Sequence, residues 1–420
     1  MKLVGVTILG AILTLLRMAS GLLVSKFVAI YGGPTGVALV GQLQSFIAGI
    51  NGLATNQISQ GVVRFSAENK DSDAYRECIP FWRAAVFVIY ISLGIAIPLL
   101  CIFSEYLSVW LFDNKDLYWL IIVAALALPF NVINSLLLAV LNGIGENRKN
   151  ITTSMVSISI SSIFTFVFLY FFGISGGLVA IALNNAIAAV IVFLRVRKSI
   201  WFSISYWFGP TDKKNVKELR KYLVMGVVGA LTGPTAMVIV RNIISEHTSL
   251  FDVGLWQAVM RISDAYIAMI TIGVGMYYFP KVASIKHKRE LLDVTVKVVM
   301  FVGVLVTSGA ALIFILKSFI INLLFTPEFL TANDLFKPQL LADIFKVLSF
   351  VPASILLAKG YIKLNIAAEI IVNLIFVSCS LLLVDKYGVI GANYAYLLTY
   401  ILYFIFSYLF FVYHYRKLPS

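Results

Sequence analysis

The chain has 420 residues, of which 60% are hydrophobic and only 13% charged, and its mean hydropathy is +0.94. These values exclude a soluble globular protein and indicate that lipid surrounds most of the chain. Because one membrane crossing needs about 20 apolar residues, the length accommodates about twelve spans and leaves little room for a domain outside the membrane. The formal charge of +13 does not indicate nucleic-acid binding, because the basic residues fall at the ends of apolar stretches.

Apolar stretches bounded by charged residues, Gly or Pro predict twelve helices in two sets of six. The first stretch contains Arg17 and Lys26 but no cleavage site, which favours a retained helix over a signal peptide. We expect an N-terminal lobe over residues 1–198, a basic cytoplasmic linker over 199–218 and a C-terminal lobe over 219–420. The predicted spans are 4–30, 36–63, 81–103, 117–141, 151–172 and 176–195, then 219–244, 253–279, 291–316, 335–358, 363–384 and 388–413.

The basic residues indicate how the chain is oriented. With the N-terminus in the cytoplasm, most of the 33 Lys and Arg residues lie at cytoplasmic ends, and four lie on outer loops: Lys115, Lys317, Lys337 and Lys386. The positive-inside rule therefore predicts that both termini are cytoplasmic. The basic segment 195–221 needs no further role than a solvated connection beside anionic lipid headgroups.

One short sequence recurs in both sets of helices. Residues 172–180, FGISGGLVA, align without a gap with residues 387–395, YGVIGANYA. The repeat predicts two parallel six-helix halves with a substrate cavity between them.

Six cations lie within the predicted spans, against three acids, Asp264, Asp343 and Glu369. Facing lipid, each cation would cost about 2.5–3.5 kcal/mol, so we expect them to face an interior. Even with every acid paired, this interior has an excess of positive charge, which suits a phosphate or pyrophosphate group. Lys26 and Lys297 could instead snorkel to the interface. The candidate substrate-binding cations are Arg17, Lys26, Arg241, Arg261 and Lys346.

Polar residues at helical spacing extend this candidate site. The acids Asp264, Asp343 and Glu369 are either coupling groups or members of neutral pairs, such as Arg261 with Asp264 and Asp343 with Lys346, that hold the bundle together. Amide side chains could contact sugar hydroxyls or, equally well, bond neighbouring helices. These amides are Gln57, Gln60, Asn131, Asn134 and Gln257.

Covalent chemistry is not expected. The three His residues and the three Cys residues are scattered, and no metal, phosphate-loop or dinucleotide motif occurs. We therefore predict no enzyme activity, no metal and no cofactor.

Three segments in the second half carry a family resemblance. Residues 253–258, VGLWQA, then 262–266, ISDAY, and 278–280, YFP, resemble helix eight of the Wzx-type flippases of polysaccharide repeat units. The resemblance is strongest to members that serve the enterobacterial common antigen and O-antigen. This family belongs to the superfamily that includes multidrug and toxin extruders (MATE). The length and the predicted helix count of this chain match those of the family.

The resemblance implies an all-α, MATE-like fold with a central cationic cavity. It also implies flipping of an undecaprenyl-pyrophosphate-linked oligosaccharide from the cytoplasmic to the periplasmic leaflet of a bacterial inner membrane by alternating access. Membrane lipids, a polysaccharide polymerase and a chain-length regulator would be partners. The sequence leaves the energy source open, with the proton motive force as one candidate. It assigns cavity roles to Lys26, Arg241, Asp264, Asp343 and Lys346, and less securely to Arg261.

Three other functions compete with this interpretation. A cation-coupled multidrug exporter would be expected to carry acids in the first half, yet the first helix has none. A lipid II flippase would be expected to have fourteen helices. A membrane polysaccharide polymerase would carry a long periplasmic loop, whereas the outer loops here are short.

Overall fold

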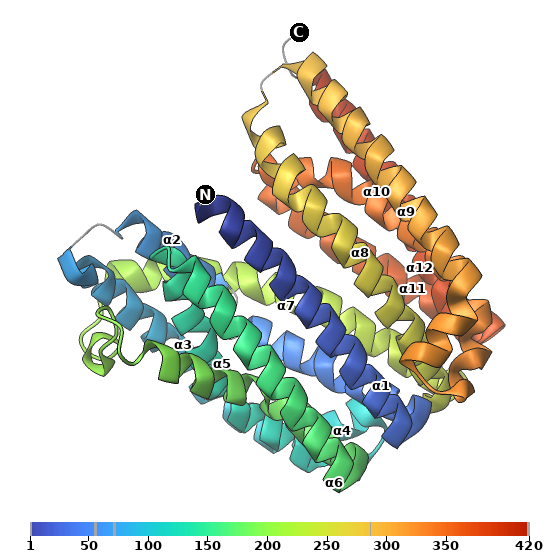
Figure 1. Ribbon diagram of the computed structural model, residues 1–420, viewed down its shortest axis with the longest axis horizontal. Helices are drawn as coiled ribbons and strands as arrows, with labels where there is room; N and C mark the ends of the chain where they lie inside the picture. The colour runs from blue at the N-terminus through green and yellow to red at the C-terminus, as the bar shows by residue number, and fades with distance from the viewer. Residues whose placement is uncertain (1, 54–56, 70–72, 286, 418–420) are drawn as a thin grey trace. The chain divides into compact units, whose positions relative to one another are not determined.

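The computed structural model describes residues 2–53, 57–69, 73–285 and 287–417. Within these ranges the chain is α-helical with short 3₁₀ turns and contains no β-strand, which confirms the all-α prediction. The helices, shown in Figure 1, are α1 (Lys2–Asn51), α2 (Gln57–Glu68), α3 (Ile79–Ile102), α4 (Ser104–Phe112), α5 (Tyr118–Gly143), α6 (Asn147–Val196), α7 (Lys213–His247), α8 (Leu250–Ser284), α9 (Lys288–Leu324), α10 (Phe336–Ala358), α11 (Ile362–Tyr387) and α12 (Val389–Lys417).

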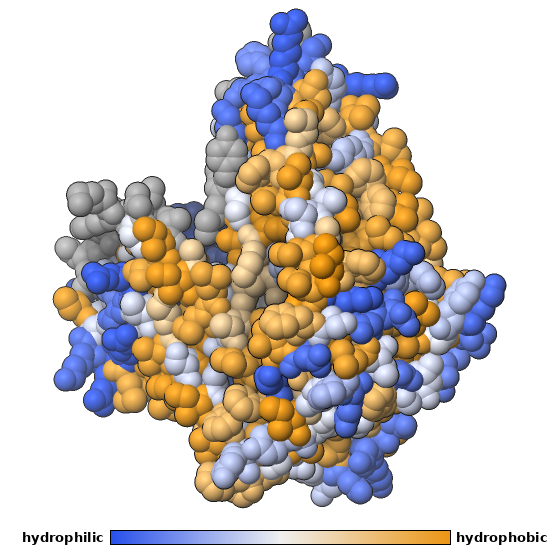
Figure 2. Space-filling model, turned by 45° about the vertical axis from the view of Figure 1, so that its right-hand side comes forward, coloured by the Kyte–Doolittle hydropathy of each residue, from blue (hydrophilic) through white to orange (hydrophobic). Residues whose placement is uncertain are grey.

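Nine helical segments of the described chain are long and apolar enough to cross a membrane. Two of them, Ile8–Asn51 and Asn147–Val196, are 44 and 50 residues long, about twice the length that one crossing needs. On the face shown in Figure 2, hydrophobic side chains cover broad areas of the helices, and hydrophilic ones gather in separate groups. The chain is therefore a multi-pass membrane protein, while the count of twelve crossings stays a prediction.

Two local features bear on the predicted spans. Within the span predicted over 36–63, α1 extends to Asn51, a π-helical turn follows at Gly52 and Leu53, and α2 begins at Gln57, with residues 54–56 outside the described residues. The short helix α4 (Ser104–Phe112) was not predicted, since its length is well below that of a crossing.

Glycines make the turns inside the two longest segments. Gly33 in α1 has φ 57° and ψ −160°, and Gly173 in α6 has φ 60° and ψ −151°. The chain reverses direction at Gly173. A hydrogen bond across the turn shows this, since Ser161 Oγ donates to the backbone oxygen of Asn184 at 3.4 Å. Only glycine adopts such a backbone conformation without strain, so each turn depends on its glycine.

The aligned sequences make the same turn in the second half. Gly388, between α11 and α12, has φ 64° and ψ −151°, which matches Gly173. Three residues later, a Cβ at Gly176 would overlap the Phe168 carbonyl oxygen, and one at Gly391 would overlap that of Leu383. In both motifs the first glycine therefore makes the turn, and the glycine three residues later allows the close helix packing.

We expect Gly391→Ala to lower the melting temperature of the purified protein, at a cost of about 1–3 kcal/mol, because the added methyl meets backbone atoms that cannot move aside. The matched control is Gly94→Ala in α3, where a Cβ meets nothing within 4 Å. Thermal unfolding in detergent measures both variants. Equal melting temperatures for the two variants would show that the close approach is not needed.

The chain divides into two compact units. One comprises Met1–Gly32 and Leu39–Thr235, and the other comprises Gly33–Ala38 and Ala236–Ser420. In the first unit, α5 packs on α6, α2 and α3 around a core that includes Trp82, Val140 and Val192. In the second, α10 packs on α12, α9 and α8 around a core that includes Tyr278, Val351 and Phe410.

Candidate functional site

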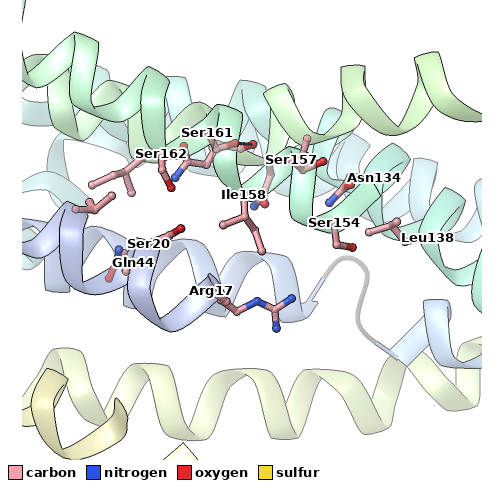
Figure 3. A pocket seen from close by; sticks show the side chains of 16 residues that line it. Arg17, Ser20, Gln44, Asn134, Leu138, Ser154, Ser157, Ile158, Ser161 and Ser162 are labelled. Atoms are coloured by element: carbon pink, nitrogen blue, oxygen red, sulfur yellow. Dashed lines mark hydrogen bonds between the residues drawn. The ribbon is translucent and has the colours of Figure 1, made fainter. Parts of the chain in front are cut away.

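A cavity of about 340 Å³ lies within the first unit, bounded by both segments of α1 and by α5 and α6 (Figure 3). Serine and amide side chains dominate its lining, with a few apolar residues such as Val24 and Ile158. A cavity with many hydroxyls and amides suits a ligand that is itself rich in hydroxyls. The polar lining residues are Arg17, Ser20, Gln44, Asn134, Ser154, Ser157, Ser161, Ser162, Asn184 and Asn185.

One face of α6 supplies most of the serines. Ser154, Ser157 and Ser161 follow one another at i, i+3 and i+7, a spacing that places them on the same side of a helix. Within the described part of the chain, Ser157 Oγ and Asn134 Oδ1 are buried and have no hydrogen-bond partner. Buried polar atoms are nearly always paired, so these two atoms are available to water or to a polar ligand.

Arg17 supplies the positive charge of this cavity. It lies on α1, across from the α6 serines in Figure 3, and is the one charged residue among the described lining residues. No ion pair or hydrogen bond of Arg17 occurs among the residues that the structure describes. A guanidinium offers a planar fork of donors that matches phosphate oxygens, so Arg17 can bind an anionic group at the edge of the polar lining.

The second unit contains a buried network around Asp343 of α10. Ser263 Oγ and Tyr266 OH donate to Asp343 Oδ2 at 2.7 and 3.0 Å, and Gln339 Nε2 donates to Asp343 Oδ1 at 3.0 Å. Asn393 Nδ2 of α12 donates to Gln339 Oε1 at 2.9 Å. The network joins α8, α10 and α12 and satisfies both oxygens of a fully buried carboxylate.

Lys346, one turn after Asp343, connects this network to Asp264. Lys346 Nζ donates to Tyr396 OH at 2.7 Å and lies 5.4 Å from the ring centres of Tyr396 and Tyr400. The Asp264 carboxylate is 3.8 Å from Lys346 Nζ, and the Asp264 side chain is 60% exposed. Asp264 is therefore an exposed acid with one long ion-pair contact, whereas Lys346 is fixed by a hydrogen bond and by two aromatic rings.

The acids have other partners in the structure than in the neutral pairs that the sequence interpretation offered as one alternative. Asp264 pairs with Lys346, whereas an ion pair between Asp264 and Arg261 is absent from the described residues. Asp343 takes its hydrogen bonds from Ser263, Tyr266 and Gln339. Spacing along one helix offered Arg261 as a partner of Asp264, whereas the contact that the structure has joins α8 to α10.

Arg241 lies deep in the second unit. Its Nε donates to Gln257 Oε1 at 2.9 Å, and its guanidinium carbon is 6.0 Å from the centre of the Trp256 ring. Gln257 thus serves as a partner of Arg241 in this structure. Arg261, one turn after Gln257, is partly buried.

The remaining sequence-predicted residues are less clearly placed. Asn131 is buried on α5, while Gln60 on α2 and Glu369 on α11 are exposed. Neither Lys26 nor Asn131 is among the residues that line the α1–α5–α6 cavity. The Gln57 side chain lies outside the described residues. The roles proposed for these side chains therefore stay predictions.

The serine face of α6 was missed by the sequence interpretation. Its signal is present, because residues 151–162 read ITTSMVSISISS, with serine or threonine at more than half of the positions. In lipid such hydroxyls either bond their own backbone or face a polar interior. Where the structure describes the chain, no three His, Cys, Asp or Glu side chains come together in a way that could hold a metal ion.

Comparison with known proteins gives the family. The family described as polysaccharide biosynthesis protein matches residues 4–286, about two thirds of the chain. The chain belongs to this family. It is also 28% identical over 391 residues to the lipid III flippase of Escherichia coli K12, covering 93% of this chain and 94% of the relative, and equally similar to that of Shigella flexneri. These matches confirm the resemblance drawn from residues 253–280.

Solved structures confirm the MATE-like fold. An inward-facing multidrug resistance transporter of the MATE family has a TM-score of 0.81 with 14% sequence identity, covering 96% of this chain and 94% of that one. The lipid II flippase MurJ has a TM-score of 0.74 with 16% sequence identity, and the alignment covers 97% of this chain and 87% of MurJ. At such identities the likeness concerns the fold alone.

Proposed function

We propose that this protein flips a lipid-linked oligosaccharide across the membrane. The main support for this proposal is the similarity to lipid III flippases along nearly the whole length of both chains. The MATE and MurJ structures show that the same fold hosts both drug export and lipid flipping, so the fold by itself does not discriminate. The polar cavity with Arg17 supports a substrate that combines hydroxyls with an anionic group.

We assign the two chemistries of the cavity to two parts of the substrate. Arg17 would bind the diphosphate that joins the lipid to the sugars, and the serines and amides would bind sugar hydroxyls. The undecaprenyl chain would stay in the lipid, so no covalent step is needed and the protein is a transporter, not an enzyme. A polysaccharide polymerase acting after the flip, with its chain-length regulator, is the expected partner.

A deletion strain tests the function directly. If the proposal is right, cells lacking this chain accumulate their lipid-linked oligosaccharide in the cytoplasmic leaflet, and the wild-type gene restores its exposure on the periplasmic side. Leaflet position can be measured in spheroplasts with an enzyme or lectin that cannot cross the membrane. Normal exposure in the deletion strain, with no second flippase present, would reject the proposal.

We also propose an inner-membrane location with both termini in the cytoplasm. In a chain whose native cysteines are replaced by alanine, Asn147→Cys and Asn215→Cys should resist impermeant thiol reagents in intact cells, because they lie beside the basic cytoplasmic ends. Thr248→Cys should label readily. Labelling of the first two in cells with a sealed inner membrane would overturn this orientation.

The serine face gives a further test. Ser157→Ala removes a buried hydroxyl that has no partner among the described residues. We expect unchanged or slightly higher thermal stability and about three- to tenfold weaker substrate binding, the effect of one lost hydrogen bond. Ser175→Ala, an exposed position of α6 outside the cavity lining, is the control. Lower stability with normal transport would assign Ser157 a purely structural role.

A further inference from the structure

The segment that follows α6 is fixed against the core of the first unit. Trp201 and Trp207 are buried, and both contact Trp82 of α3, with ring centres 6.2 and 5.4 Å apart. Arg83 Nη2 donates to the Ser205 carbonyl oxygen at 3.0 Å. Residues 199–209 are therefore a packed element of the protein and do not form a free linker.

The outward side of this element is apolar. Ile200, Ile204 and Phe208 are 88%, 62% and 65% exposed and recur every four residues. They follow Phe193 and Leu194, which are exposed at the end of α6. Leaving three large apolar side chains in water would be unfavourable, so this side needs an apolar environment.

Positive charge flanks the apolar side. Between residues 195 and 217 the chain has six basic residues and a single acid, Asp212. All six basic residues are exposed: Arg195, Arg197, Lys198, Lys213, Lys214 and Lys217. Exposed apolar side chains between basic residues are the pattern of segments that lie in the interface of an anionic membrane.

We infer that residues 197–214, here called the interfacial anchor, dock on the anionic phospholipid leaflet next to α6. Ile200, Ile204 and Phe208 insert at the boundary between headgroups and acyl chains, while the flanking Arg and Lys side chains bind lipid phosphates. The position of this segment in the chain favours phospholipid over a protein as its binding partner. It begins directly after Asn147–Val196, which is apolar enough to cross the membrane, so it starts within a few residues of the interface. The buried Trp201 and Trp207 then fix its position relative to the first unit.

Spin labels at single positions of the full chain test this inference. The native cysteines Cys78, Cys101 and Cys379 are replaced by alanine, and nitroxides are attached at Ile200→Cys, Ile204→Cys and Phe208→Cys in vesicles containing phosphatidylglycerol. Ser205→Cys, an exposed polar position next to Ile204, is the matched control. The first three labels should be reached by oxygen, which dissolves in lipid, and protected from a water-soluble nickel chelate. The control label should be reached by the chelate.

Proteolysis gives an independent measurement. The double variant Ile204→Ser with Phe208→Ser should be cleaved by trypsin at Lys198 or Lys213 about tenfold faster than the parent chain in the same vesicles, with an unchanged melting temperature. The parent chain should become equally sensitive when phosphatidylcholine replaces the anionic lipid. Strong nickel access at all three labels would show that the segment lies in water. Protection from both oxygen and nickel would show burial against another protein or a second copy of this chain. Either result would overturn the inference.

Discussion

Replacing Arg17 by alanine should abolish complementation of a flippase-deficient strain while leaving the protein at its normal level in the membrane. The side chain lines the polar cavity and has no ion pair among the described residues, so its removal costs the fold little. A hydrogen bond to a charged group contributes about 1.5–3 kcal/mol, which corresponds to roughly a ten- to hundredfold loss of affinity for the diphosphate.

Two variants distinguish a specific role from a general need for charge. Arg17→Lys keeps the charge but loses the planar fork, so we expect it to restore only part of the activity. Lys297→Ala removes a different cation of a predicted span, one that is exposed and pairs with Asp293 at 2.8 Å, and should keep full activity. Flipping rates in reconstituted vesicles measure all three. Wild-type rates for Arg17→Ala would remove Arg17 from the binding site.

The sequence predicted those features that depend on one segment at a time. Apolar length located most helices, and the repeated glycine motif located the equivalent turns at Gly173 and Gly388. The high cost of charge in lipid singled out Arg17, which lines the cavity. Each of these features follows from local conformation or from transfer free energy. None of them requires knowledge of which helices are neighbours.

Features that depend on two helices could not be predicted in this way. The partner of Asp264 proved to be Lys346, because α8 packs against α10, and helical spacing within α8 favoured Arg261. Serines were overlooked for a similar reason, since a hydroxyl in a helix often bonds the carbonyl four residues earlier, as Thr165 does to Ser161. Whether Ser157 has such a partner depends on the geometry of the folded chain.

The two acids near Lys346 should respond very differently to mutation. Asp343→Ala removes the acceptor of three hydrogen bonds and leaves the hydroxyl groups of Ser263 and Tyr266 without their acceptor, while Gln339 keeps its bonds to Ser263 and Asn393. We expect a loss of about 3–5 kcal/mol in stability, seen as a lower melting temperature and reduced protein in the membrane. Asp264→Asn, by contrast, loosens only a 3.8 Å contact of an exposed side chain, which is worth about 1 kcal/mol or less.

Asp264→Asn is therefore the variant in which a coupling role can be seen without a stability effect. If an incoming diphosphate draws Lys346 away, the 3.8 Å contact between Asp264 and Lys346 is lost, and that loss would bias a bundle with two states. Asparagine removes the negative charge on which this coupling depends. Coupling then predicts a stable protein whose slow residual flipping no longer responds to an imposed pH gradient, whereas a purely structural pair predicts a retained response. Flipping in vesicles with and without the gradient decides between them, and a wild-type gradient response in Asp264→Asn would exclude Asp264 as the proton carrier.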